Sequence, residues 1–320
     1  MTLSTTFRAI HSPTTDDIGR IADLDPFNPF VTNEYASVRR AIGAEVLVMV
    51  EADSGTVAAG CLAFLTRGRL NSRLEITSLP PIIDENVFWN GLFVECRSLG
   101  VSALSVNSFA SMRAVIPRSR QQAAAKKRIE YVLDLTVPNL SKLVNRRHNR
   151  QIKAARAAHL ELRASDDASA REIHVSLSNA SLDRRRQRGE SVISKTMREE
   201  VDAFLDNGAG RILQAVQGSE VLSSLLIAQS RLGAYGQSSG TSDEGRKVGA
   251  SHFLFFETAA ALRSEGFKVF NLGGADQQSS GLREFKLGMG SIAIELESAE
   301  FFTGNMFKRA AARAAALLRR

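Results

Sequence analysis

The 320-residue sequence contains the same order of secondary-structure signals twice. In the first half, three apolar runs typical of strands precede a helical segment and a further strand. The same order returns in the second half after a spacing of about 165 residues. A chain with this repeat is expected to bury its apolar faces in two similar units, each with a mixed sheet. We therefore predict an α/β protein with two tandem domains.

The strands and helices of the repeat are expected at defined places. The first copy comprises strands at 45–52, 56–66, 72–82 and 101–109 and a helix at 86–100. The second copy comprises three strands within 211–243, a helix at 250–264 and a strand at 269–274. Between the copies we expect a strand at 131–135, one long helix over 139–159 and a helical pair over 168–206.

The charge of the chain is unevenly distributed. The net charge is +7, and arginines cluster in 146–156, in 183–188 and in the C-terminal segment 307–320. Such clusters favour an anionic partner such as a nucleotide, a phosphate, RNA or a membrane surface, although solvated basic helices give the same composition.

Two further features concern the class of protein. The sequence lacks a long uncharged apolar stretch and a secretory N-terminus, so we expect no transmembrane helix and a cytoplasmic location. The two cysteines show no metal-ligand spacing and are expected as buried thiols, with no metal site.

The segment GLREFKLGMG, residues 281–290, places Lys286 between Phe285 and a group of glycines. A lysine is a mobile point charge that can meet a developing anion. Glycines such as Gly288 and Gly290 allow the backbone to bend tightly beside a ligand. A surface lysine and a reaction-centre cation are both compatible with this pattern.

The repeated unit, with a glycine-containing turn before its helix, resembles the fold of the GNAT acyltransferases. The second half resembles more specifically the FemABX-like group, which is built from two tandem GNAT-type domains. Four segments carry the likeness: LDLTVPNLSKLVNRRHNRQIKAARAAHLEL, DRRRQRGE, GASHFLFFETAAALRSEGFKVFNLGG and GLREFKLGMG. Together they cover about residues 131–300, whereas residues 1–130 match in element order only.

This resemblance implies how the chain is divided and what it does. Residues 1–130 would form a GNAT-like domain on the acceptor side, 131–303 the GNAT domain with the donor and catalytic site, and 304–320 a basic helix. The implied reaction transfers an acyl or aminoacyl group to an amine. The donor would be a co-substrate, acyl-CoA or aminoacyl-tRNA, with no tightly bound cofactor.

The resemblance also assigns the donor site. The turn RKVGAS would hold the CoA pyrophosphate on free backbone N–H groups at a helix start. Its contributing residues would be Arg246, Gly249, Ala250 and Ser251. In this fold two neighbouring parallel strands splay apart and receive the donor arm. The lining would then include Tyr235, Gln237, Ser239, Asn271 and Gly273. Strand alternation places the first three on one face.

The catalytic roles follow from the same likeness. Lys286 would stabilise the oxyanion or leaving group, and Phe285 would form an aromatic wall beside it. Asp276 could accept the proton of the amine, and His252 is a second option or a helix cap. In two places the chain departs from the pattern: no tyrosine follows the strand 269–274, and Met289 replaces the family's aromatic residue.

Three functions therefore remain open. The first is an acyl-CoA-dependent N-acyltransferase. The second is a transferase that uses aminoacyl-tRNA and binds it through the basic helices. The third is a non-catalytic module that binds RNA or another anion through the C-terminal segment. The acceptor would be an amine-bearing small molecule or a cell-wall precursor.

Overall fold

The computed structural model describes residues 5–68, 71–111, 116, 122–190, 195–275 and 279–304. The chain divides into two compact units. Unit 1 comprises residues 1–25, 30–128 and 295–320, and unit 2 comprises 26–29 and 129–294. The predicted domain limits, 1–130 and 131–303, stay a prediction. The proposed C-terminal helix falls in 304–320, of which 305–320 lie outside the described residues.

Unit 1 begins with a strand and two helices that precede the first copy of the repeat. Its elements are β1 (Thr5–His11), α1 (Thr15–Leu24), η1 (Pro29–Val31, shared with unit 2), α2 (Asn33–Ala41), β2 (Glu45–Asp53), β3 (Thr56–Arg67), β4 (Ser72–Ile76), α3 (Glu85–Ser98) and β5 (Val101–Val106). The predicted order is confirmed, with β4 shorter than expected.

Unit 2 repeats this order of elements. The elements from β6 onward are β6 (Gln122–Asp134), η2 (Leu140–Lys142), α4 (Arg146–Ala157), β7 (Glu161–Ala164), α5 (Ala168–Gln187), α6 (Arg198–Asp206), β8 (Gly210–Gln217), β9 (Glu220–Gln229), β10 (Gly233–Thr241), α7 (Asp243–Lys247), α8 (Ala250–Ser264), β11 (Val269–Gly274), α9 (Ser280–Gly288) and β12 (Ile292–Phe302). Residues 122–128 of β6 and 295–302 of β12 belong to unit 1. The bounds predicted for the helix 250–264 and the strand 269–274 are confirmed.

The single helix predicted over 139–159 is wrong. The chain instead forms the short helix η2 and then α4. Asn139 caps the first, and the Asn145 side chain accepts a hydrogen bond from the backbone N–H of His148 at 2.8 Å. Asparagine is favoured at the N-cap of a helix. Asn145 therefore begins the new helix α4 after η2 has ended.

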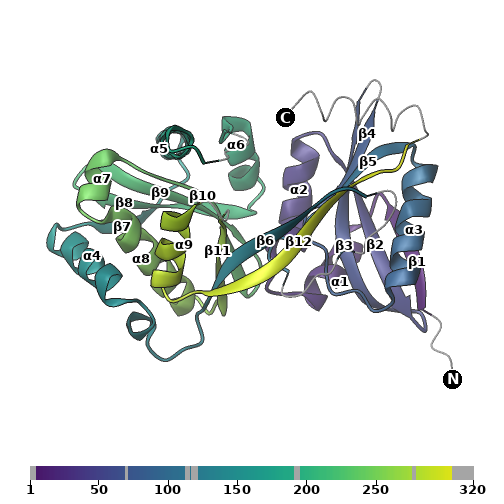
Figure 1. Cartoon of the computed structure of the whole chain (residues 1–320), viewed down its shortest axis with the longest axis horizontal. Coiled ribbons are helices and arrows are strands. Elements are labelled where there is room, and N and C mark those ends of the chain that lie inside the picture. Colours follow the sequence, from purple (N-terminus) through teal and green to yellow (C-terminus); the bar gives the residue numbers. More distant parts are fainter. Residues whose placement is uncertain are drawn as a thin grey trace. The chain divides into compact units, whose positions relative to one another are not determined.

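The strand order of each unit includes a strand from outside the repeated element order, β12 in unit 1 and β6 in unit 2 (Figure 1). In unit 1 the order is β1-β2-β3-β4-β5-β12, and in unit 2 it is β6-β11-β10-β9-β8-β7. Residues 299–302 of β12 pair antiparallel with β5, and residues 130–134 of β6 pair antiparallel with β11. Among the described strand pairs whose residue register is defined, β4–β5 and β10–β11 are parallel and the others are antiparallel.

The sheet of unit 1 is covered on both faces. Helix α3 packs Phe88, Leu92 and Cys96 on one face, together with Cys61 of β3, and both cysteines are buried free thiols. Helices α1 and α2 pack on the other face, where Tyr35 meets Phe64 edge to face.

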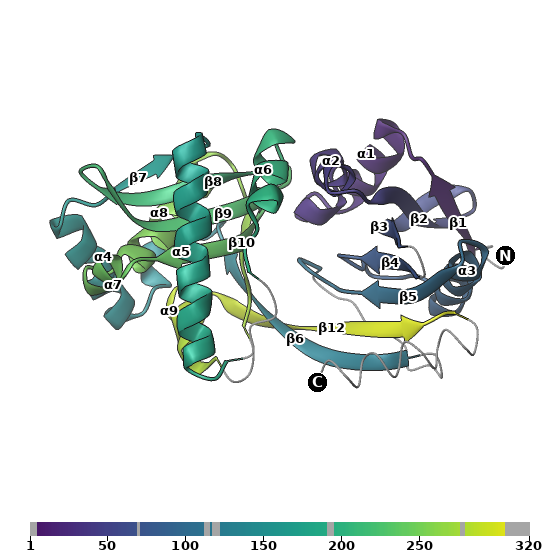
Figure 2. The ribbon, with the colours of Figure 1, turned by 90° about the horizontal axis from the view of Figure 1, so that it is seen from above.

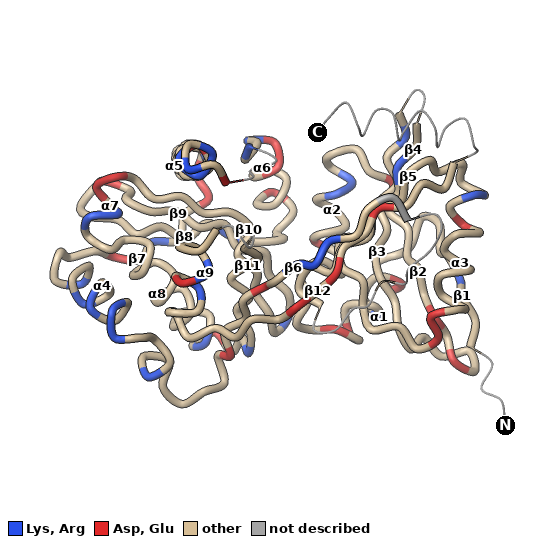
Figure 3. Tube along the Cα trace, in the orientation of Figure 1, with Lys and Arg blue, Asp and Glu red and all other residues tan. Residues whose placement is uncertain are grey.

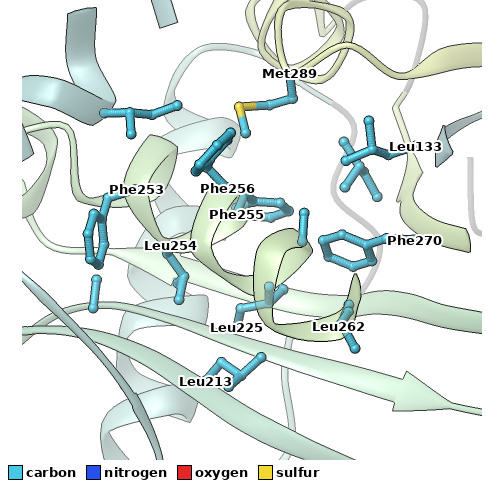
Figure 4. Close-up of a cluster of buried hydrophobic side chains, with 14 of the residues drawn as sticks. Leu133, Leu213, Leu225, Phe253, Leu254, Phe255, Phe256, Leu262, Phe270 and Met289 are labelled. Atoms are coloured by element: carbon cyan, nitrogen blue, oxygen red, sulfur yellow. The ribbon is translucent and has the colours of Figure 1, made fainter. Parts of the chain in front are cut away.

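In unit 2 the helix α8 packs between the sheet and the residues of α4 and Met289 at the end of α9. Figure 4 shows its side chains between Leu213 and Leu225 of the sheet and Met289. The helix carries four consecutive apolar residues, Phe253 to Phe256, and all are buried. A helix with so wide an apolar surface is stable only when packing covers most of it. Helix α5 crosses the opposite face of the strands β8, β9 and β10 (Figure 2). The two faces of this sheet are thus covered by different helices.

Candidate active site

The parallel strands β10 and β11 separate part of the way along their length. They pair only at Gly233–Val269, Ala234–Phe270 and Tyr235–Asn271, although β10 continues to Thr241 and β11 to Gly274. We call the place where they part, just after Tyr235 and Asn271, the fork. The predicted splayed strands are therefore present. Backbone groups that no longer bond between the two strands need other partners, from the protein, from water or from a ligand.

The prediction that Tyr235, Gln237 and Ser239 share one face is wrong. A register shift between Gly236 and Ser238 adds one residue, Gln237, to β10. Tyr235 pairs with Ala228 and Ser239 with Leu225, and these two partners are three residues apart in β9. Successive residues of a strand point to opposite faces, so Tyr235 and Ser239 do as well. The Gln237 side chain is exposed at the bulge.

The turn predicted to hold phosphates opens α8, as expected. Gly249 is the N-cap residue in the left-handed conformation, with φ of 75°, and no side chain of the described residues caps the helix. Ala250 and Ser251 are its first residues. The first N–H groups of such a helix lack intrahelical partners and attract anions. Arg246 belongs to the short helix α7, is exposed and donates to Asp243 at 3.1 Å.

Three groups converge at the fork. Lys286 of α9 is 5% exposed, and its Nζ donates to the carbonyl of Gly274 at 2.7 Å. Gly273 of β11 has φ of 77°, and a Cβ at this position would lie 3.7 Å from both Lys286 Nζ and the Tyr235 hydroxyl. The lysine is therefore a buried cation beside the separating strands, and a surface role is excluded.

A carboxylate that the sequence reasoning missed lies at the same place. Glu130 of β6 is 1% exposed and accepts from the Tyr235 hydroxyl at 2.8 Å and from Asn271 Nδ2 at 2.7 Å. Asn271 Oδ1 in turn accepts from the Gly273 N–H at 2.8 Å. The available signal was a glutamate within the apolar run RIEYVLDL, next to the predicted domain boundary.

Phe285 lies in a different environment from Lys286. Its ring packs edge to face against His252, with 5.1 Å between centroids, and also contacts His148 and Phe255. Burial, His148 and Arg147 lower the pKa of His252 to about 4, and burial together with Arg147 lowers that of His148. Both imidazoles are therefore neutral near pH 7 and form an aromatic cluster at the start of α8.

The arginine-rich end of α5 is directed largely at the protein itself. Arg185 and Arg188 donate to Glu190 at 2.8 and 2.7 Å, and Glu190 also accepts from Ser279 at 2.6 Å. Burial raises the pKa of Glu190, but these hydrogen bonds outweigh it and lower the value to about 2. Arg184 donates to the carbonyl of Thr241. This cluster fixes the start of α9, the helix that carries Lys286.

Helix α4 presents the basic cluster of residues 146–156 to solvent. Arg146, Arg150 and Lys153 recur at helical spacing and are exposed. Figure 3 shows Lys and Arg along the length of this helix. The middle of α4 is close to the start of α8, because a Cβ on Gly249 would meet the Gln151 carbonyl at 2.9 Å.

Two further predictions concern the end of the site. The proposed base Asp276 lies outside the described residues. Met289 is 1% exposed and belongs to the apolar cluster around α8, so it fills the core behind α9. Among the described helices none is long and apolar enough to cross a membrane.

Comparison with known protein families gives a match for part of the chain. Residues 142–287 match the model of a family described as Acetyltransferase (GNAT) domain. No curated protein matches the chain.

Solved structures share the fold over nearly the whole chain. FemX aligns with a TM-score of 0.65 and 11% identity, covering 91% of this chain and 96% of its own. A tandem GNAT protein from the clavulanic acid biosynthesis pathway aligns with a TM-score of 0.55 and 11% identity, covering 94% and 99%. The C-terminal domain of a putative lysylphosphatidylglycerol synthetase from Agrobacterium fabrum aligns with 0.51 and 17%, covering 95% and 96%. At such identities the likeness concerns the fold alone.

Proposed function

We propose that the chain, whose residues 142–287 belong to the acetyltransferase (GNAT) domain family, moves an acyl group from an acyl-CoA thioester to an amine. One observation carries the proposal. The pairing of β10 and β11 ends after Tyr235 and Asn271, and α8, which lies between these strands in the sequence, starts without a side-chain cap. The first feature suits an extended donor arm, and the second suits its pyrophosphate.

The donor would be held by backbone and charge. The N–H groups of Ala250 and Ser251 would bind phosphate oxygens, because helix N-termini favour anions. Arg246 is exposed near this turn and would add a mobile positive charge. Asn271 and Gly273 would line the donor arm at the fork. Gln237 and Ser239 would be reached only beyond the bulge, from different faces of β10.

Lys286 would act on the reacting atoms. Its ammonium group lies within the fork region, where it would stabilise the oxyanion and then the leaving thiolate. Phe285 would support this role indirectly, because its ring is packed into the histidine cluster and holds α9 against α8. The solved structure of the tandem GNAT protein from the clavulanic acid pathway is described as being "without AcCoA". This wording links acetyl-CoA with a protein of the same fold.

A second function uses aminoacyl-tRNA as donor. The observation that favours it is the exposed basic face of α4 (Arg146, Arg150 and Lys153), which could bind a phosphate backbone. The structural likeness to FemX and to the lysylphosphatidylglycerol synthetase domain agrees with an amine or a cell-wall precursor as acceptor. The arginines at the end of α5 are engaged within the protein and contribute less to such a surface.

Binding measurements separate the two donors. At a hundred times its Kd, a donor that binds only the native chain stabilises it by about 2.7 kcal/mol, which raises the melting temperature. We expect this shift with acetyl-CoA or desulfo-CoA, and amide formation when a panel of amines is screened by mass spectrometry. A shift with tRNA alone, lost on raising the salt concentration, would favour the second function.

A further inference from the structure

Glu130 is a buried charge that the functions assigned so far do not use. Only 1% of the residue is exposed. Burial of a carboxylate is costly unless hydrogen bonds compensate it. Both oxygens of Glu130 accept such bonds, one from the Tyr235 hydroxyl and one from the Asn271 amide. The donors come from β10 and β11, at the last pair before the strands separate. The carboxylate is therefore built into the fork.

The Tyr235 hydroxyl links this carboxylate to the reaction centre. It donates its own proton to Glu130 Oε1 at 2.8 Å, which leaves the lone pairs of the phenolic oxygen as acceptors. The Tyr235 hydroxyl oxygen and Lys286 Nζ are both 3.7 Å from the position that a Cβ of Gly273 would occupy. A group that reacts beside Lys286 would thus be within reach of the phenolic oxygen.

We propose that Tyr235 and Glu130 form a proton relay that serves as the general base and then as the acid, a proposal that rests on the proposed acyl transfer. The amine nitrogen attacks the thioester carbonyl carbon, the C–N bond forms, the C–S bond breaks, and its electron pair leaves with sulfur. The amine proton moves to the phenolic oxygen as the phenolic proton moves to Glu130. The same path in reverse returns a proton to the thiolate, so an amide and a CoA thiol are released and both residues are restored.

This relay replaces the tyrosine that is missing from α9. The side-chain hydroxyls in the segment between β11 and Lys286 are those of Ser279 and Ser280, and the segment contains no tyrosine. In this fold the phenol reaches the centre from β10 instead, and Glu130 supplies the basic group behind it. His252 is directed at Phe285 and His148, in the aromatic cluster at the start of α8. The geometry therefore favours the phenol over the imidazole.

The experiment compares four variants by steady-state kinetics with acetyl-CoA and an amine that the wild type acylates. Tyr235→Phe and Glu130→Gln each keep the shape of the side chain and are expected to lower kcat by about 100-fold, with little change in KM for acetyl-CoA. The double variant should be no slower than the slower single variant, because the two residues act as one unit. Tyr35→Phe, which removes another buried hydroxyl in unit 1, is the control and should retain wild-type kcat.

Isotope measurements distinguish a relay from a structural role. In mixtures of H2O and D2O, the wild-type rate should depend on the deuterium fraction as two protons moving together require. Tyr235→Phe, which has no oxygen to relay either proton, should abolish this two-proton dependence. A wild-type kcat in Tyr235→Phe, or single effects that multiply in the double variant, would overturn the relay while leaving acyl transfer intact. A wild type that transfers no acyl group from acetyl-CoA to any amine, and shows no thermal shift with it, would overturn both proposals.

Discussion

The two parallel strand pairs of the molecule occupy the same place in the repeat but differ in their pairing. In unit 1, β4 and β5 pair from Ser72–Val101 to Ile76–Val106. Backbone hydrogen bonds continue beyond the strands, from Phe109 N–H to the Thr77 carbonyl. In unit 2, β10 and β11 part after three pairs. Among the described strands, the pairing of a parallel pair thus stops early only in unit 2, where we propose that the donor arm binds.

The helices that follow these strands differ in the same sense. The N-terminus of α3 in unit 1 is occupied by the protein's own carboxylates. Asp84 caps it, and Glu51, which is fully buried, accepts from the N–H groups of Ile83 and Asp84 at 2.8 and 2.6 Å. The N-terminus of α8 begins instead at Gly249 without a side-chain cap. The same order of elements thus gives a helix start occupied by carboxylates in unit 1 and one without a side-chain cap in unit 2, where we propose that the donor's phosphates bind.

The largest expected effect concerns the buried cation of unit 2. Replacing Lys286 by methionine keeps most of its volume and removes the charge beside the fork. We expect kcat for acyl transfer to fall by about 100- to 1,000-fold, the usual loss when one electrostatic stabiliser is removed. Lys268→Met, which changes an exposed lysine of the same unit, should leave kcat within twofold. Equal rates for the two variants would remove Lys286 from the reaction.

The next largest difference expected between the units is in their stability at acidic pH. His174 of α5 is fully buried between Ser224 and Ser238, and burial lowers its pKa from 6.5 to about 4. The unfolded chain then binds more protons between these values. The stability is complete above pH 6.5 and falls by about 3 kcal/mol as the pH drops through 4.

Hydrogen exchange at pH 7 and pH 5, corrected for the intrinsic rate, tests this difference between the units. Peptides of unit 2 should lose protection before those of unit 1, whose single histidine, His11, is exposed. His174→Gln should weaken the pH dependence, whereas the exposed His159→Asn should not. An unchanged pH dependence in His174→Gln would contradict the assignment.

Gly249, at the start of α8, should affect the affinity for the donor. Gly249→Ala places a Cβ 2.9 Å from the Gln151 carbonyl in a left-handed backbone conformation, so the turn must shift. We expect acetyl-CoA to bind about tenfold more weakly, by isothermal titration, because the N–H groups no longer point at the phosphates. Gly208→Ala has the same backbone strain but open space around it, and should cost about 1 kcal/mol of stability without loss of affinity.

The smallest effect is expected from unit 1. Asp84→Ala removes the cap of α3 and should lower the free energy of unfolding by about 1 kcal/mol. It should not change the affinity for acetyl-CoA. The strands β4 and β5 remain paired, so unit 1 offers no place between them for a donor arm. Titration should give one CoA per chain in the wild type and in this variant. A stoichiometry of two would contradict the contrast between the units.

Much of unit 2 could be predicted from local pattern. The helix 250–264 ends before Gly266, and its apolar residues and flanking glycines define both of its ends. Lys286 was singled out by its neighbours Phe285 and Gly288. The face of Ser239 was not predictable, because a bulge at Gln237 depends on the register with β9 rather than on β10 itself. Glu130 was missed because its partners, Tyr235 and Asn271, are more than 100 residues away in sequence.

The sequence by itself determined the repeat, the order of strands and helices, and the motifs that indicate acyl transfer, because each depends on neighbours along the chain. The tertiary structure alone decided which strands pair fully and which separate. It also decided that β12 joins the sheet of unit 1 and β6 that of unit 2. These choices depend on hydrogen bonds and packing between distant segments, which a local pattern does not specify.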